Sequence, residues 1–230
     1  MKIDDPKIVA LRGQVTAAQQ EFDMAVVFHE VWKPAAYDND LHSRMGTSYA
    51  TQAFLVTRIA LRREMVLALM RLWDTNKESI RMSLVAATLR EADVIDALAL
   101  DRAKRLGLLE SIEQMRADLG KRAADAILLI SKYKGGSHHA VLEKLSTLRH
   151  ERLAHRQIAS TPTTGADATD EEIEEFYQDN SKLICILLHA VNAHAYDPED
   201  HAKVYRYYAS HFWAGVRGEQ TEGHPNYRPR

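Results

Sequence analysis

The chain has 230 residues, of which 46% are hydrophobic and 27% are charged, and its formal net charge is −2. This length and apolar content suffice for one substantial core or two small ones. A chain so close to neutral is not a general nucleic-acid coat, which needs an excess of lysine and arginine over a broad face.

The single cysteine and the apolar runs limit the class of protein further. Cys185 is alone, which excludes an intramolecular disulfide and a cysteine-based metal site. The N-terminal stretch MKIDDPKIVALRGQ has no apolar signal core. The longest apolar runs, such as LICILL, fall well short of the ~20 residues that span a bilayer. We therefore expect a cytoplasmic protein with no membrane partner.

Apolar residues recur at helical spacing almost throughout, and no convincing alternating strand is present. This pattern predicts an all-α fold, a bundle of about six to eight helices. The predicted helices cover, in chain order, residues 6–32, 44–73, 77–89, 91–107, 109–133, 138–158, 171–195 and 198–217. We expect a single helical domain over residues 1–217 and a disordered tail over residues 218–230.

Several breaks between these helices have sequence signals. Pro34 opens the stretch PAAYDND, which predicts a loop, and DTN at residues 74–76 ends the second helix. The glycine pair in YKGGS suits a left-handed turn, after which Ser137 is placed to cap the next helix. Asp170 is placed to cap the helix from 171, and Pro198 is at a first helical position.

Residues 145–155, LSTLRHERLAH, combine two arginines and two histidines at the end of a leucine-rich run. At about 100° per residue, Arg149 and Arg152 lie within roughly 40° of Leu145, and His155 about 80° away. Leu145 belongs to the apolar face, so this face becomes cationic without turning outward. Buried guanidinium groups require partners. Either acidic residues pair with them at a helix contact, or they line a cleft that binds an anion.

The spacing of an arginine and a following histidine carries no information alone, because the composition predicts roughly three chance matches. The chain holds three such pairs, namely Arg149 with His155, Arg206 with His211 and Arg217 with His224. The histidine spacing argues against a metal site. His150 and His155 are five residues apart, which separates them by about 140° around a helix. We expect neither a metal ion nor another cofactor.

LRHERLAH resembles the signature of the HEPN superfamily, in particular its abortive-infection (AbiU-type) branch. That branch also carries an upstream helix ending in Arg-Leu-aromatic-Asp, which here is Arg71-Leu72-Trp73-Asp74. The resemblance covers approximately residues 20–195. The aromatic C-terminal helix over 198–217 follows this part of the chain. One departure is His150, which stands where asparagine or aspartate is frequent.

Members of this superfamily are helical bundles that usually dimerise, and many are metal-independent ribonucleases of toxin–antitoxin or phage-defence systems. The resemblance implies that Arg149 and His155 act at the scissile phosphate of RNA. Arg152 or Arg156 would then hold a neighbouring phosphate. The implied partners are a second copy of the chain, RNA and an antitoxin protein, and no DNA is expected.

A second interpretation is a non-catalytic helical module that binds a protein or RNA partner, which the near-neutral charge and His150 favour. Arg71 and Asp74 also allow two interpretations. They form either a local helix pair worth a few tenths of a kcal/mol, or a group in which Asp74 orients Arg149 or His155. In the last helix, Val204, Tyr208 and Phe212 recur every four residues, which favours a docking face over base stacking.

Overall fold

The structure is a computed structural model of the chain, and it describes residues 5–149 and 168–230. The regular secondary structure of these residues is helical, and their one extended pairing is an isolated bridge between Trp73 and Arg81. The all-α prediction is therefore confirmed. The elements are α1 Pro6–Tyr37, α2 Asn39–Met45, α3 Tyr49–Arg71, α4 Met82–Leu89, α5 Ala92–Leu106, η1 Leu109–Ser111, α6 Ile112–Tyr133, α7 His139–Leu148, α8 Asp170–Leu187, η3 Leu188–Asn192 and α9 Pro198–Ala214.

The predicted loop at PAAYDND is wrong, because α1 continues through Pro34 to Tyr37. A proline inside a helix removes one backbone donor and crowds the preceding turn. The indole N–H of Trp213 donates to the Val31 carbonyl in this turn at 2.8 Å, which anchors the end of α1 to α9. Asp38 then caps α2 by accepting from two backbone N–H groups, so this stretch forms the end of one helix and the start of another.

Other boundaries confirm some local predictions and correct two. Gly107 ends α5 in the left-handed region with φ of 69°, and Pro198 is the first residue of α9. Ser137 does not cap α7, because its hydroxyl is hydrogen-bonded to the ring of the next residue. Thr169, rather than Asp170, caps α8, and it forms a reciprocal capping box with Glu172.

The helices belong to two compact units, each of which is described by itself. Unit 1 contains the residues up to Phe22 and the range Ala68–Asp197, and unit 2 contains Asp23–Leu67 and Pro198–Arg230. The predicted domain over 1–217 therefore contains parts of both units. No helix in the described ranges has both the length and the apolar character that crossing a membrane requires.

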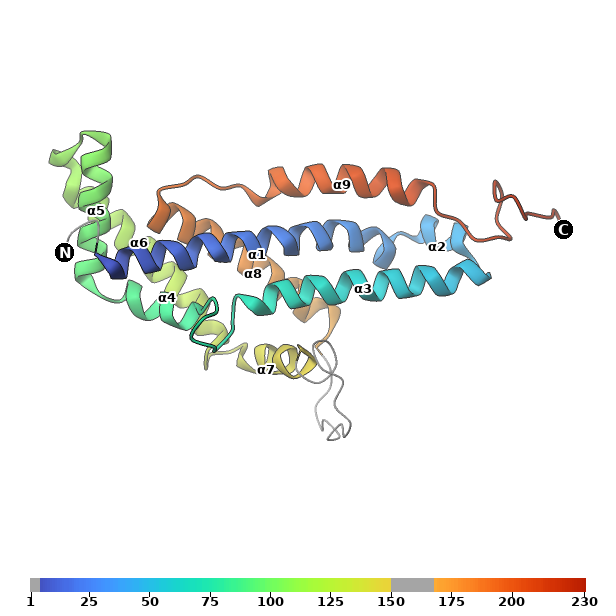
Figure 1. Ribbon diagram of the computed structural model, residues 1–230, viewed down its shortest axis with the longest axis horizontal. Coiled ribbons are helices and arrows are strands. Elements are labelled where there is room, and N and C mark those ends of the chain that lie inside the picture. Colours follow the sequence, from blue (N-terminus) through green and yellow to red (C-terminus); the bar gives the residue numbers. More distant parts are fainter. Residues whose placement is uncertain (1–4, 150–167) are drawn as a thin grey trace. The chain divides into compact units, whose positions relative to one another are not determined.

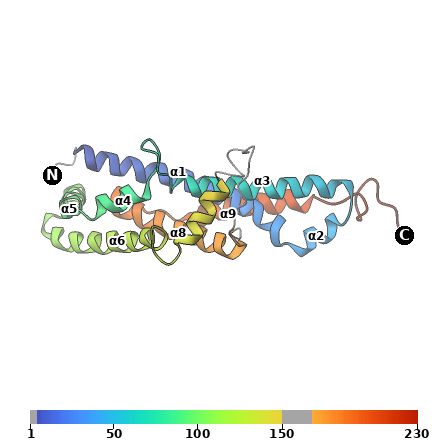
Figure 2. The same ribbon diagram turned by 90° about the horizontal axis from the view of Figure 1, so that it is seen from below.

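Unit 1 is centred on a buried aromatic cluster. In this unit α5 packs on α6, and α6 runs beside α8 (Figure 2). The ring of Tyr133 lies edge-on to Phe176 at 4.9 Å and to Trp73 at 5.5 Å between centroids. Trp73 donates its indole N–H to the Asn180 side chain at 2.9 Å, and Asn180 donates to the Phe176 carbonyl. The cluster thus fixes the end of α3 against α6 and α8.

Unit 2 has a smaller core, in which α9 runs beside the second half of α1 (Figure 1). One cluster of its buried residues consists of Ala35, Leu41, Met45, Phe54, Ala209 and Trp213. Arg44 donates to the carbonyls of Trp213, Ala214 and Val216 at the end of α9. The Gly218 N–H in turn donates to the Arg44 carbonyl at 2.9 Å, so the predicted tail begins at a hydrogen-bonded residue.

The face of α9 that the sequence marks as a docking surface is exposed. Val204, Tyr208 and Phe212 have exposed fractions of 46%, 58% and 59%. The residues of α9 that the unit buries are instead Ala202, Ala209 and Trp213. Val204, Tyr208 and Phe212 therefore lie on a different face of α9 from the one that the unit buries.

We expect Asn180→Ala to lower the free energy of unfolding by about 1–3 kcal/mol, because it leaves the buried indole N–H of Trp73 without an acceptor. The measurement is urea unfolding followed by tryptophan fluorescence. Gln178→Ala, an exposed change on the same helix, controls for helix propensity and should shift stability by less than about 0.5 kcal/mol. Equal effects of the two changes would contradict a role of this hydrogen bond.

Candidate functional site

Arg149 directly follows α7 and lies on the side of the helix that faces the protein. The buried residues of α7 are Val141, Leu142 and Leu145, as the sequence predicts. The Arg149 N–H still bonds to carbonyls in the last turn of α7, and its side chain is 22% exposed. The apolar face of α7 therefore ends in a half-buried guanidinium.

The partner of this guanidinium is the carboxylate of Asp74. Arg149 Nη2 donates to Asp74 Oδ2 at 2.8 Å. The other carboxylate oxygen, Oδ1, accepts the backbone N–H groups of Thr75 and Asn76 at 2.7 and 3.1 Å. The carboxylate is thus oriented by the turn that ends α3, and one oxygen remains directed at Arg149. These contacts use one of the five N–H donors of the guanidinium for Asp74.

The hydrogen bonds change the protonation of Asp74. Partial burial alone would raise the pKa of its carboxyl group. The hydrogen bonds from Arg149, Asn76 and Thr75 together outweigh burial, so the pKa lies below its ordinary value of 3.8. Asp74 is therefore a carboxylate at neutral pH, and the pair with Arg149 is an ion pair.

Arg71 has a different partner. Its Nη1 donates to Glu21 Oε2 at 3.1 Å, and its side chain is 46% exposed. Of the two residues predicted to orient the motif, Asp74 contacts Arg149, whereas Arg71 contacts a glutamate of α1. The predicted local pair of Arg71 with Asp74 is therefore replaced by two longer-range pairs.

A pocket of about 210 Å³ opens beside Arg149. It is lined by Met70, Trp73, Asp74, Thr75, Lys134, His139, Leu142, Glu143, Ser146 and Arg149. The sequence does not mark Lys134 or His139 as site residues, because they have no motif spacing to Arg149. Their signal is only their place in the turn YKGGSHHA before α7. The pocket has cationic groups at both ends of α7 and aromatic surface from Trp73.

Both ring nitrogens of His139 lie close to oxygen atoms at the N-terminal end of this pocket. Its Nδ1 lies 3.2 Å from the Tyr133 carbonyl, and its Nε2 lies 3.3 Å from Glu143 Oε1. The imidazole is thereby oriented between a backbone acceptor and a carboxylate. Because the side chain of His139 is 48% exposed, its outer edge remains accessible to a bound molecule.

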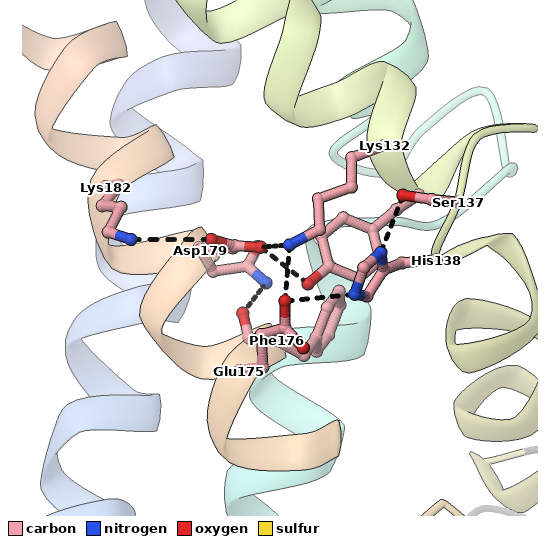
Figure 3. A network of polar contacts seen from close by, with 9 residues as sticks. Lys132, Ser137, His138, Glu175, Phe176, Asp179 and Lys182 are labelled. Carbon is pink, nitrogen blue, oxygen red and sulfur yellow. Dashed lines mark hydrogen bonds and ion pairs between the residues drawn. The ribbon is translucent and has the colours of Figure 1, made fainter. Parts of the chain in front are cut away.

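A second polar network fixes the turn that leads into α7 (Figure 3). Lys132 lies between Asp179 and Glu175, with its Nζ at 2.5 and 2.7 Å from their carboxylates. Tyr133 donates to Asp179 at 2.9 Å, and His138 Nε2 lies 3.0 Å from Glu175. Burial first, and then the hydrogen bond to Asp179, raise the pKa of Tyr133, so its hydroxyl stays protonated and donates. The network holds α6, α8 and the start of α7 together.

The other predicted site residues, His155, Arg152 and Arg156, lie outside the described residues, and so does His150. Their roles therefore stay predictions. Within residues 5–149 and 168–230, no three histidine, cysteine, aspartate or glutamate side chains gather as they would around a metal ion. The expected absence of a metal also stays a prediction.

Comparison with known families places the chain in a class. A family model of HEPN domains, described as AbiU2, matches residues 8–212. Since this match covers most of the chain, the protein belongs to the HEPN superfamily. Within it the chain is a member of the AbiU2 family, which confirms the resemblance carried by LRHERLAH. No curated protein and no solved structure matches the chain.

Asp74→Asn tests the ion pair with little change of shape. A carboxylate with a depressed pKa stabilises the fold above the pKa of the unfolded state, and this contribution is lost as pH falls through the folded-state pKa. We expect the variant to lose about 1–2 kcal/mol of unfolding free energy near pH 7, because one charge-assisted hydrogen bond is removed. The loss should shrink as pH falls below the ordinary value of 3.8.

The measurement is urea unfolding of both proteins over a series of pH values. Asp125→Asn, an exposed change on α6, serves as the matched control. A stability difference for Asp74→Asn that does not vary with pH would contradict an ionised Asp74 in the folded state.

Proposed function

We propose that the protein is a metal-independent endoribonuclease of a toxin–antitoxin or phage-defence system. The observation that carries the proposal is the half-buried guanidinium of Arg149, fixed by Asp74 at the edge of a pocket. Asp74 and the Met70 carbonyl take two of the five N–H donors of this guanidinium, which leaves others for a phosphate, and the planar group suits bidentate binding. Membership of the HEPN superfamily supports RNA as the source of this phosphate.

The proposed reaction is attack of an RNA 2′-hydroxyl on the adjacent phosphorus. The 2′-oxygen forms a bond to phosphorus, the bond to the 5′-oxygen breaks, and a cyclic phosphate remains. A base removes the 2′ proton and an acid protonates the leaving 5′-oxygen. Histidine titrates near neutral pH and suits either task. We assign one of the two proton transfers to His155. Arg149 stabilises the negative charge that develops on the phosphate.

A second histidine is needed for the other proton transfer. In a symmetric dimer the partner chain supplies a second set of Arg149 and His155. Arg152 or Arg156 would hold a neighbouring phosphate. A homodimer is therefore part of the proposed mechanism, and an antitoxin protein is its proposed regulator.

The pocket beside Arg149 supports an extended substrate. His139 and Arg149 are ten residues apart, which corresponds to about 15 Å along a helix. This separation is too long for both side chains to contact one phosphate. His139 and Lys134 would therefore contact another part of the RNA backbone, and Trp73 lines the space between them.

One observation favours a second function. Arg149 already has a carboxylate partner, which is the arrangement expected of an arginine that only joins two helices. In that case the protein is a non-catalytic helical module that binds a protein or RNA partner. Variants that separate the stability of this pair from RNA cleavage decide between the two functions.

Arg149→Lys and His155→Ala provide this separation. Lysine keeps the charge opposite Asp74 but loses the planar fork, so we expect unfolding free energy to fall by less than about 1 kcal/mol. His155→Ala should cost no more than about 0.5–1 kcal/mol, as for most changes outside a core. Both variants should lose RNA cleavage and growth arrest by about 100-fold or more, if these residues act on the phosphate.

The measurements are melting, cleavage of a fluorescent RNA and growth on induced expression, all on the same proteins. Arg63→Lys, an exposed change on α3, is a matched control and should behave as wild type. An unaltered cleavage rate in both variants would rule out the proposed roles. A wild-type protein without cleavage or toxicity would favour the binding module.

The proposed mechanism also requires association of two chains. Sedimentation should show a species near twice 26.1 kDa at micromolar concentration. A dimer is required because the proposed symmetric site takes one motif from each copy. A monomer throughout the concentration range would remove the basis for a site built from two motifs.

A further inference from the structure

Helix α3 is apolar on two opposite sides, and the core of unit 2 covers one of them. Phe54 belongs to the buried cluster of this unit, and Leu61 packs against that cluster. Val56 and Ile59 lie on the other side of the helix, where they are 67% and 66% exposed. A surface helix usually has one apolar face, whereas a helix that is apolar all round is usually buried. The second side of α3 therefore has the composition of a contact surface.

The exposed side of α3 forms a stripe along about four turns of the helix. Between residues 49 and 63, every residue within roughly 60° of Val56 around the helix is exposed. Positions 49, 52, 56, 59 and 63 alternate in spacing between three and four residues, which is the spacing of a seam between two packed helices. We call this set the α3 stripe, and its members are Tyr49, Gln52, Ala53, Val56, Ile59, Ala60 and Arg63.

The α3 stripe is complementary in shape to a second copy of itself. When two copies of α3 pack antiparallel about a twofold axis at Val56, residues at equal distances before and after Val56 face each other. Ile59 then faces Ala53 of the partner subunit, and Ala60 faces Gln52 of the partner subunit. Each larger side chain therefore meets a small one, which allows the two helices to approach closely without a clash.

The two ends of the stripe are complementary in charge. At one end the N–H of Tyr49 donates to Glu219 Oε2 at 3.1 Å, and Tyr49 is 90% exposed. At the other end Arg63 lies 3.7 Å from Glu64 in an exposed ion pair, which contributes little stability.

This charge pattern selects the antiparallel arrangement. There Arg63 faces Tyr49 of the partner subunit, and Glu219 of the partner subunit lies beside that tyrosine. The guanidinium is attracted both to an aromatic ring and to a carboxylate. A parallel arrangement would instead bring Arg63 against Arg63 of the partner subunit, and like charges repel.

A lipid surface fits the α3 stripe less well. Helices that lie on membranes combine large apolar side chains on one face with many lysines and arginines on the other. In the α3 stripe, Ala53 and Ala60 present little apolar area, and Gln52 and Arg63 interrupt it. The alternation of large and small side chains favours another helix of the same sequence.

We propose that the α3 stripe is a self-association surface, on which a second copy of the chain docks antiparallel about Val56. The stripe lies in unit 2 and shares no residue with the lining of the Arg149 pocket. The proposal is independent of ribonuclease activity, because a non-catalytic module can associate through the same surface. One pair of helices is a small contact beside stable interfaces of about 1,200–2,000 Å², so we expect a dissociation constant of micromolar order.

Sedimentation equilibrium of the full chain tests the proposal. Val56→Glu places two carboxylates against each other on the twofold axis, so it should weaken association by about 100-fold or more. Leu128→Glu is the matched control, because Leu128 is an exposed leucine on α6 of unit 1, and it should associate as wild type. Circular dichroism and the melting temperature show whether each variant is folded.

An exchange of charges tests the antiparallel arrangement and also serves if Val56→Glu does not fold. Arg63→Glu should weaken association by about tenfold, because it places a carboxylate near Glu219 of the partner subunit. Glu219→Arg, added to Arg63→Glu, brings opposite charges together again in exchanged positions. The double variant should therefore recover most of the lost affinity, whereas Glu219→Arg alone should associate weakly.

Three results would overturn the proposal. They are a monomer at every concentration, association unaltered in both Val56→Glu and Arg63→Glu, and a loss in Leu128→Glu as large as in Val56→Glu. Binding of a monomeric chain to vesicles of phosphatidylcholine and phosphatidylserine, abolished by Val56→Glu, would assign the stripe to a lipid surface and would also overturn it. RNA cleavage is measured separately, so a chain that associates through the stripe without cleaving RNA would contradict only the proposed function.

Discussion

The carboxylate of Asp74 is the group on which the position of the motif arginine depends. Its Oδ1 atom accepts hydrogen bonds from the backbone of the turn after α3, and its Oδ2 atom accepts from Arg149 at the end of α7. The carboxylate is therefore preorganised by local structure, and the guanidinium adapts to it. Such an arrangement lowers the entropy that a long arginine side chain loses when it binds a phosphate.

The start of α7 is held by contacts with Tyr133, and these contacts lie within unit 1. The backbone carbonyl of Tyr133 is hydrogen-bonded to His139, and its ring packs edge-on against His138. Its hydroxyl donates to Asp179. The aromatic cluster of Trp73, Tyr133 and Phe176 connects this turn to the end of α3. Both ends of α7 therefore contact residues that belong to this buried cluster or adjoin it. A substitution in the cluster would be expected to shift the position of Arg149.

Sequence periodicity predicted the helical class well, since a buried face recurs every three or four residues in most segments. It failed at Pro34, because the end of α1 is held by long-range contacts with α9, including the hydrogen bond from Trp213 to the Val31 carbonyl, for which the local sequence has no signal. The inward direction of Arg149 was predictable from the helical wheel, and Asp74 entered only through a family resemblance. The places of Lys134 and His139 depend on tertiary packing, for which the sequence has no local signal.

Unit 2 joins residues that the ribosome produces at very different times. Its core needs Trp213 and Ala209 from α9 beside Leu41 and Phe54, which belong to the first quarter of the chain. During translation these early apolar side chains lack their contacts with Ala209 and Trp213 until α9 has left the exit tunnel. The intervening range Ala68–Asp197 belongs to unit 1 and is complete earlier. Nascent chains therefore carry an exposed apolar surface for most of synthesis, which is the kind of surface that chaperones bind.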